Sequence, residues 1–312
     1  MKKLIAIGEA LIDFLPQEKS RSIKEISAFY PKVGGAPLNV LGAYSKLGGE
    51  TEMITKLGKD PFGDKIIAEM DKYNIGKTFL KRTEMANTAL AFVSLGDNGE
   101  REFSFYRNPS ADMLLSEDDI DEKCLQDAYA LHFCSVSLID APIKNAHRKL
   151  LDLANKSNVL ISFDPNIRLP LWKDHEELRK TVNDFIPLAN VLKIADDELD
   201  FILNGKGIED LFVGNVKLAI ITKGKNGADL YLKDKRPISS KPISVASIDT
   251  TGAGDCFIGS FLWKLNSVGI TLDNIDDRKE DLLSDCLNFA NKCAAMSTTK
   301  LGAIESYPEK PE

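Results

Sequence analysis

Residues 249–255 of the chain read Asp249-Thr250-Thr251-Gly252-Ala253-Gly254-Asp255, directly after the apolar run Ile243–Ile248. Behind them, Phe257, Phe261 and Leu265 recur at the spacing of one helix face. Two glycines in such a turn let successive backbone N–H groups point inward, and the dipole of the following helix adds positive potential there. The stretch therefore predicts a strand, a cup for a phosphate or a developing negative charge, and a helix.

The acid that ends this stretch, Asp255, is expected in the first helical turn, beside the cup. Phosphoryl transfer needs neutralised phosphate oxygens and an aligned attacking hydroxyl. We expect the amides of Gly252, Ala253 and Gly254 to hold the charge and Asp255 to accept the hydroxyl proton. No GxxxxGK[ST] occurs, so this is not a P-loop. The alternative, a capped turn without chemistry, does not easily explain two acids bracketing the cup.

Short apolar runs alternate with helical stretches along most of the chain. This pattern predicts an α/β fold with a mainly parallel sheet covered on both faces, and ligands at the carboxyl ends of its strands. The runs are Leu4–Ile7, Met53–Leu57, Leu131–Val136, Val159–Phe163, Val191–Ile194, Leu218–Ile221 and Ile243–Ile248.

Two stretches, 11–33 and 78–107, instead alternate apolar and polar residues. Ala89–Tyr106 is expected to form a hairpin that turns at Gly96–Gly99. We predict that the two stretches form a small β-sheet lid over a core made of residues 1–10, 34–77 and 108–312.

Composition narrows the function further. The 312 residues carry 40 Lys and Arg against 47 Asp and Glu, a net charge of −7, without a basic run. No nucleic-acid or membrane partner is therefore expected. The apolar N-terminal run is too short for a secretory signal. Five cysteines without CxxC spacing indicate reduced thiols in a cytoplasmic protein.

A second glycine cluster, Gly34-Gly35, precedes a helix with proline in its first turn. Paired glycines allow a ligand to approach the backbone closely, and Asn39 can hydrogen-bond sugar hydroxyls. An ordinary turn with a buried asparagine is the alternative.

The sequence GGAPLNVLGAYSKLG at 34–48 and the sequence DTTGAGD at 249–255 together resemble the PfkB (ribokinase-like) carbohydrate kinase family. The resemblance spans essentially the whole chain. It implies ATP-dependent phosphorylation of a sugar hydroxyl, a Rossmann-like α/β/α three-layer core and a β-sheet lid that often forms dimer contacts. A possible homodimer through the lid is one such implication.

By this resemblance, Asp255 matches the family's catalytic base and Gly252–Gly254 its anion hole. Asp13 matches an acid near the lid that hydrogen-bonds sugar hydroxyls, while Gly34, Gly35 and Asn39 match the sugar-binding stretch. Without the resemblance, Asp13 would pass as an exposed acid at a strand end.

Two arginines resemble substrate contacts of fructokinase relatives. Arg168 ends a DPNxR stretch at 164–168, and Arg107 belongs to FYRNPSAD at 105–112. Each alone is more often a surface ion-pair partner. On the nucleotide side, the sequence at 222–227 resembles the family's TxGxxG loop, and a later helical asparagine matches a position near the adenine. The implied nucleotide-binding residues are Thr222, Lys223, Gly224, Gly227 and Asn291.

The chain departs from the family's NxxE element at its first position, where Ala195 replaces the asparagine, while Glu198 is retained. Glu198 is expected to organise hydrated Mg²⁺. The resemblance also implies a monovalent cation, such as K⁺, beside Asp249 and the carbonyl of Thr251.

These features favour an ATP-dependent kinase acting on D-fructose to give fructose 6-phosphate. A 2-keto-3-deoxygluconate kinase is the alternative within the family, since Arg107 and Arg168 could pair with a substrate carboxylate; other PfkB sugar and nucleoside kinases also remain open. A non-catalytic sugar-sensing protein is the alternative of another class, and intact Asp255 and glycines argue against it. A dinucleotide-dependent dehydrogenase would need GxGxxG after the first strand, where the chain has Gly8-Glu9-Ala10.

Overall fold

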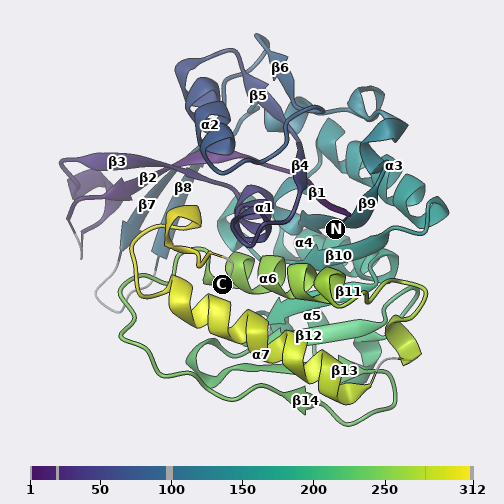
Figure 1. The fold of residues 1–312 in the computed structure, drawn as a ribbon. Coiled ribbons are helices and arrows are strands. Elements are labelled where there is room, and N and C mark those ends of the chain that lie inside the picture. The colour runs from purple at the N-terminus through teal and green to yellow at the C-terminus, as the bar shows by residue number, and fades with distance from the viewer. Residues whose placement is uncertain (1, 19–20, 96–100, 278, 310–312) are drawn as a thin grey trace.

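An extended sheet organises the computed structural model, which describes residues 2–18, 21–95, 101–277 and 279–309. Its strand order is β14-β13-β12-β11-β10-β9-β1-β4, parallel from β12 to β4 and antiparallel at β13 and β14 (Figure 1). These strands are β1 (Lys3–Ile7), β4 (Thr51–Ile54), β9 (Ala128–Cys134), β10 (Leu160–Asp164), β11 (Val191–Ala195), β12 (Leu218–Thr222), β13 (Ala228–Leu232) and β14 (Ile238–Ser239). Parallel strands buried on both faces explain the continuous apolar runs.

Helices cover both faces of this sheet and make a three-layer α/β/α core, as predicted. One hydrophobic cluster joins the sheet to α1 (Ala36–Lys46), α2 (Pro61–Lys72), α6 (Ala253–Ser267) and α7 (Glu280–Ser297). A second cluster on the opposite face joins it to α3 (Pro142–Lys156), α4 (His175–Phe185) and α5 (Asp196–Leu203). Helix α5 directly follows the carboxyl end of β11, whereas α1 follows β3 (Phe29–Gly34) and α6 follows the long loop after β14.

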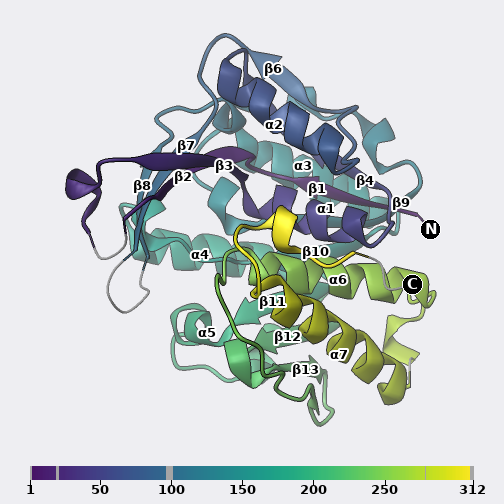
Figure 2. The ribbon, with the colours of Figure 1, turned by 60° about the vertical axis from the view of Figure 1, so that its left-hand side comes forward.

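A separate four-stranded sheet extends away from the core (Figure 2). Its order is β3-β2-β7-β8, from β2 (Leu11–Pro16), β3 (Phe29–Gly34), β7 (Leu90–Leu95) and β8 (Arg101–Tyr106). Strands β7 and β8 pair antiparallel, as the predicted hairpin requires, while its turn lies outside the described residues. Within the predicted lid stretch 78–107, β6 (Lys81–Thr83) instead pairs with β5 (Lys56–Gly58) in a small sheet of its own.

Two predicted strands differ in the structure. The run Met53–Leu57 is divided between β4 and β5, which belong to different sheets. The run Ile243–Ile248 forms no strand. Ile243 and Val245 border a cavity and Ile248 is 62% exposed, so apolar character alone misled the prediction.

Within the described residues, no helix is long and apolar enough to cross a membrane. All five cysteines are buried and unbonded to one another.

Candidate active site

The loop before α6 turns at Gly252, within the stretch for which the sequence predicts a glycine cup. The amide of Ala253, one of those assigned to the cup, instead donates to the carbonyl of Thr250 at 3.2 Å. Gly252 is the N-cap of α6 and adopts the left-handed conformation, with φ +70°, which glycine tolerates best. Its carbonyl accepts the first helical hydrogen bond, from the amide of Cys256 at 2.8 Å. The amides of Gly254 and Asp255 lie in the first turn, where an α-helix supplies no carbonyl of its own. The turn thus presents N–H groups and the positive end of the helix dipole to a ligand.

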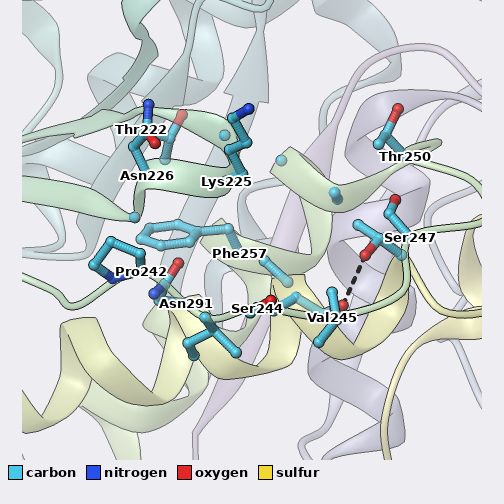
Figure 3. Close-up of a pocket in the computed structure, with 18 residues that line it drawn as sticks. Thr222, Lys225, Asn226, Pro242, Ser244, Val245, Ser247, Thr250, Phe257 and Asn291 are labelled. Carbon is cyan, nitrogen blue, oxygen red and sulfur yellow. Dashed lines mark hydrogen bonds between the residues drawn. The ribbon is translucent and has the colours of Figure 1, made fainter.

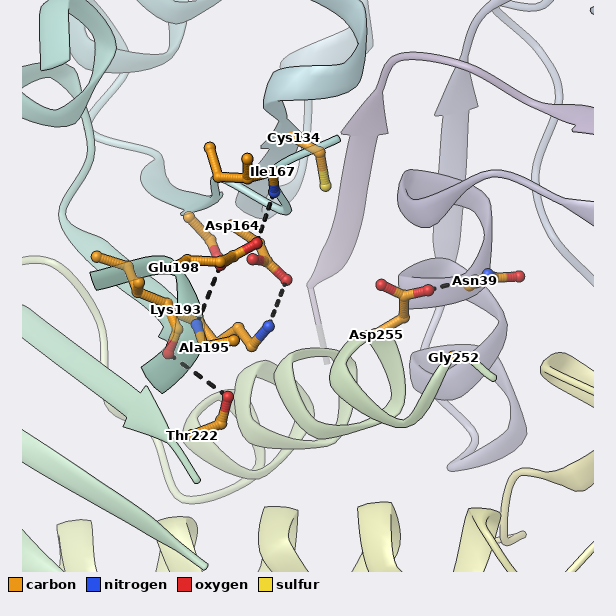
Figure 4. A network of polar contacts seen from close by, with 12 residues as sticks. Asn39, Cys134, Asp164, Ile167, Lys193, Ala195, Glu198, Thr222, Gly252 and Asp255 are labelled. Atoms are coloured by element: carbon orange, nitrogen blue, oxygen red, sulfur yellow. Dashed lines mark hydrogen bonds and ion pairs between the residues drawn. The ribbon is translucent and has the colours of Figure 1, made fainter. Parts of the chain in front are cut away.

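Asp255 is buried beside this cup, with only 9% of its surface exposed. Its Oδ2 accepts a hydrogen bond from Nδ2 of Asn39 at 2.9 Å, which joins α6 to the glycine-rich start of α1 (Figure 4). Burial raises the pKa of the Asp255 carboxyl, while the Asn39 hydrogen bond and the positive charges of Lys193 and Arg168 oppose the rise. A carboxylate with a raised pKa is a stronger base than a solvent-exposed one, and its three partners favour its ionised form.

A buried ion pair lies on the other side of the cup. Nζ of Lys193, on β11, is 3.0 Å from Oδ2 of Asp164 at the end of β10 (Figure 4). A Cβ added to Gly254 would meet Nζ of Lys193 at 3.1 Å, so the ammonium borders the cup directly. Burial lowers the pKa of Lys193, but Asp164 and Glu198 more than compensate, and the net pKa is raised. Lys193 therefore stays cationic and adds to the positive potential of the cup.

Glu198, the retained member of the NxxE element, organises two backbone segments. Its Oε1 accepts the amide of Ile167 at 2.6 Å and its Oε2 accepts the amide of Ala195 at 3.1 Å. Burial raises the pKa of Glu198, and Lys193 opposes this. Ala195 offers only a methyl group where relatives are expected to carry an asparagine, so the backbone amide of Ala195 is the group that contacts Glu198.

The donor set suits a hydrated magnesium ion better than a directly coordinated one. Among the described residues, no cluster of three or more histidine, cysteine or carboxylate side chains could hold a metal. Oδ1 of Asp164 is buried and has no hydrogen-bond partner in the described part of the chain. An Mg²⁺ ion bound to the nucleotide phosphates would keep several water ligands, and that oxygen and Glu198 would accept hydrogen bonds from those waters.

A cavity of about 500 Å³ opens beside the cup (Figure 3). This volume falls within the usual range for small-molecule sites. Thr250, Ala253 and Gly254 line one part of it, and the loop after β12 lines another. Apolar walls complete it, from Pro242, Ile243, Val245, Phe257, Ala294 and Ala295. Such walls suit a flat aromatic base whose phosphates reach the cup.

The structure brings four of the five predicted nucleotide residues to this cavity. Thr222, Gly224, Gly227 and Asn291 all line it. Nδ2 of Asn291 donates to the carbonyl of Lys241 at 2.8 Å, so this side chain is buried and held rather than exposed.

Lys223 lies differently from the other four. It forms an ion pair with Asp229 on β13, and this pairing raises the pKa of Lys223. The lysine that lines the cavity is its neighbour Lys225.

On the sugar side, Asp13 on β2 lies against Gly34 at the end of β3. A Cβ on Gly34 would overlap the Asp13 carboxylate, which explains a glycine there. Gly35 is the N-cap of α1 with φ +109°, and a Cβ on it would be 2.5 Å from the carbonyl oxygen of Glu9. The three residues therefore lie together, between the four-stranded sheet and α1.

The two predicted arginines have different surroundings. Arg107 is buried, forms an ion pair with Asp112 and donates from Nη1 to the carbonyl of Val136 at 3.2 Å. Arg168 donates from Nη1 to the carbonyl of Ile167 at 2.9 Å. Burial raises the pKa of both Asp164 and Asp255, and the charge of Arg168 opposes this rise, so Arg168 belongs to the electrostatic surroundings of the cup.

Asp249, the first residue of the loop, fixes the loop through both of its carboxylate oxygens. Its Oδ1 accepts the amide of Thr251 at 2.9 Å and its Oδ2 accepts the amide of Gly302 at 2.9 Å. The carboxylate therefore holds the loop against the segment that follows α7.

Sequence reasoning missed the Lys193–Asp164 pair as part of the site. A lysine inside the otherwise apolar strand Val191–Ala195 was the available signal, since a buried lysine needs a partner charge. The partner could not be identified from the sequence, because β10 and β11 meet only in the folded sheet.

Comparison with known proteins agrees with this geometry. The profile described as pfkB family carbohydrate kinase matches residues 1–310. A probable fructokinase-2 of Arabidopsis thaliana is 41% identical, over 98% of this chain and 92% of its own length. Two solved structures are similar as well. Fructokinase of Xylella fastidiosa with bound ATP has a TM-score of 0.88 and 30% identity, covering 99% of this chain and 95% of its own. Fructokinase of Vibrio cholerae O395, in a fructose, ADP and calcium ion bound form, has a TM-score of 0.83 and 28% identity, covering 99% and 96%. The chain thus belongs to the pfkB family of carbohydrate kinases.

Proposed function

We propose that this carbohydrate kinase transfers the γ-phosphate of ATP to D-fructose and forms fructose 6-phosphate. The observation that carries the proposal is the position of Asp255, buried beside a cup of backbone N–H groups at the edge of a nucleotide-sized cavity. The fructokinase names of the similar proteins support fructose as the acceptor.

In the proposed reaction, the Asp255 carboxylate removes the proton of the sugar hydroxyl as its oxygen attacks the γ-phosphorus. The bond between that phosphorus and the β,γ-bridging oxygen breaks, and ADP leaves with the electron pair. The amides of Gly254 and Asp255, with the Lys193 ammonium, stabilise the charge on the equatorial phosphate oxygens. Asn39 holds the Asp255 carboxylate in place, with its 2.9 Å hydrogen bond.

Magnesium bound to the ATP phosphates would neutralise part of their charge, and Asp164 and Glu198 are placed to hold its water ligands. A monovalent cation beside Asp249 and the Thr251 carbonyl is a further part of the proposal. Because both carboxylate oxygens of Asp249 already accept hydrogen bonds, such an ion would depend mainly on backbone carbonyls.

The Arg107 ion pair favours a neutral sugar over an acidic one. A keto-deoxy acid would need an arginine able to bind its carboxylate, whereas Asp112 already neutralises Arg107 inside the chain. This observation removes Arg107 as a partner for a substrate carboxylate and, together with the fructokinase names of the relatives, ranks fructose above 2-keto-3-deoxygluconate.

A coupled assay of ADP release tests the proposal, with fructose, ribose and 2-keto-3-deoxygluconate as competing acceptors. We expect the highest kcat/KM for fructose. A value for the acid far above that for fructose would reject the substrate assignment. If no sugar supports ATP-dependent turnover, the proposed kinase activity is rejected.

We also propose a homodimer through the four-stranded sheet. Register places Phe14, Phe92 and Tyr106 on one face of that sheet, and Asp13, Ala91 and Phe105 on the other. Phe92 contacts the rings of Phe14 and Tyr106 at centroid distances of 4.6 and 5.3 Å. Phe14 on this face also contacts Phe62 of α2, with ring centroids 5.7 Å apart, so the part proposed to contact a second copy is the part around Phe92 and Tyr106. The buried, unbonded cysteines agree with the cytoplasm as the proposed location.

A further inference from the structure

We propose that Tyr307 is a positioning residue that holds the anion cup in its working shape through the carbonyl of Gly252. This inference rests on the proposed role of the cup in phosphate transfer. It adds a residue from the C-terminal segment, which neither the glycine motif nor the substrate residues include.

The contact is direct and buried. The hydroxyl of Tyr307 donates a hydrogen bond to the Gly252 carbonyl oxygen at 2.9 Å, and Tyr307 is only 2% exposed. A Cβ added to Gly252 would overlap this hydroxyl and would lie 3.0 Å from Cβ of Ala303. The tyrosine therefore packs against the one residue of the loop that has a left-handed backbone.

Peptide geometry transmits this contact into the cup. The carbonyl of Gly252 and the N–H of Ala253 belong to one planar trans peptide, and that N–H donates to the carbonyl of Thr250 at 3.2 Å, so fixing the direction of the carbonyl also fixes this turn of the loop. The same oxygen also accepts the amide of Cys256 at 2.8 Å. With both donors in place, the first peptide of α6 cannot rotate, and the amides that follow it keep their directions.

The segment that carries Tyr307 is itself anchored at two points. The amide of Gly302 donates to Asp249, at the start of the cup loop. Nζ of Lys46, near the end of α1, donates to the carbonyl of Ile304 at 3.3 Å. Tyr307 therefore works from a fixed support, which a group must have in order to hold another in place.

The competing interpretation is that Tyr307 only fills the core. Its ring belongs to the same hydrophobic cluster as α1 and α6, so removal of the ring would disturb packing. Tyr307→Phe removes the hydroxyl and keeps the ring, which separates the two interpretations.

The chain offers a matched control in Tyr129. This tyrosine is also buried, at 5% exposure, and its hydroxyl donates to the carbonyl of Ile270 at 2.7 Å. It lies near the start of β9, at the opposite end of the sheet from the cup. Tyr129→Phe thus loses the same chemical interaction away from the site.

The test measures kcat, KM for the sugar, KM for ATP and Tm in wild type and both variants. Inhibition by ADP with aluminium fluoride, an analogue of the transferring phosphate, is measured in parallel. For Tyr307→Phe we expect a kcat about five- to tenfold lower, the loss expected for one hydrogen bond. We expect both KM values to stay within about twofold and inhibition by the analogue to weaken by a similar factor as kcat. Tyr129→Phe should lower Tm by about as much and leave kcat unchanged.

An unchanged kcat in Tyr307→Phe would overturn the inference. So would a rise in KM without a fall in kcat, or an equal loss of kcat in both variants, because each would indicate a general structural effect. Unfolding of Tyr307→Phe alone at the assay temperature would overturn it as well. The proposed kinase activity is judged separately, on wild type, so failure of one claim does not conceal failure of the other.

Discussion

At the residue scale, the proposed chemistry depends on one carboxylate and the charges around it. Asp255 is buried enough to raise its pKa, yet Asn39, Lys193 and Arg168 favour its ionised form. A carboxyl with a raised pKa is a stronger base than an exposed one, and no direct ion pair neutralises Asp255 among the described residues. The Lys193 charge is instead shared with Asp164, which leaves Asp255 free to accept a proton.

Replacement of Asp255 by asparagine should remove the base and keep the shape of the site. We expect kcat to fall by about 10²- to 10⁴-fold, the usual contribution of general-base catalysis. ATP binding, followed by calorimetry, should change little, because the cavity for the base and the cup amides remain. Asp152→Asn, on the exposed side of α3, serves as a control with normal turnover. More than about a tenth of wild-type activity in Asp255→Asn would contradict the assignment.

Loss of the Asn39 side chain should change the pH dependence of the reaction. Its Nδ2–H donates to the ionised form of Asp255, so the hydrogen bond lowers the pKa of that carboxyl. In Asn39→Ala the pKa of Asp255 should therefore rise, and the acid limb of the kcat/KM profile should move to higher pH. The measurement is kcat/KM for the sugar across the acidic and neutral range. An acid limb that stays in place or moves to lower pH would exclude Asp255 as the group that titrates.

At the scale of elements, helix α6 is bounded by glycines in the same backbone conformation. Gly252 has φ +70° before the helix and Gly269 has φ +72° after it. Their surroundings differ, since a Cβ on Gly252 would meet Tyr307 and Ala303, whereas one on Gly269 would meet no atom within 4 Å. An added methyl group would therefore cause backbone strain alone at Gly269, but both backbone strain and steric overlap at Gly252.

Alanine at these two positions should have unequal effects. Gly269→Ala should lower the free energy of unfolding by about 1–2 kcal/mol, the cost of a left-handed alanine, and leave kcat unchanged. Gly252→Ala should lower it by more and also reduce kcat severely, because the cup must shift to admit the methyl group. Urea denaturation and steady-state kinetics measure the two effects. Equal losses of stability with full activity in both variants would show that the cup tolerates displacement.

At the scale of the whole molecule, the four-stranded sheet has two unlike faces. Tyr106 is 62% exposed on the aromatic face, and Tyr30 is 55% exposed on the face that carries Asp13. On the face of Tyr106, the partly exposed rings of Phe14 and Phe92 lie beside it, and such a group of aromatic side chains is typical of contact with another chain. Because the face with Asp13 is the one proposed to bind the sugar, we expect a partner to contact the aromatic face.

Introduction of a charge on each face tests the proposed dimer. Tyr106→Glu should convert the dimer to a monomer, because a carboxylate buried in an aromatic contact loses its hydration. Tyr30→Glu, with similar exposure on the other face, should stay dimeric. Light scattering during gel filtration gives the mass of each variant. A monomeric wild type, or a dimer that survives Tyr106→Glu, would refute the contact through this face.

Much of the fold could be predicted because its signals are local. Apolar runs identified most strands of the main sheet, and the glycine motif predicted the loop and helix at 249–267. The prediction was wrong at Ile243–Ile248, where Ile243 and Val245 line a cavity, because apolar character does not distinguish a strand from the wall of a ligand site.

The sequence by itself determined which backbone turns are possible and which side chains could carry chemistry. The glycines at 34, 35, 252 and 254 allow their turns wherever they stand, because conformational freedom is a property of the residue itself. Only the tertiary structure decided which groups meet. It placed Asn39 against Asp255 across 216 residues, Lys193 against Asp164, Asp112 against Arg107, and Tyr307 against Gly252. Such partners depend on the order of strands in the sheet and on the path of the C-terminal segment, and no local spacing in the chain encodes either of these.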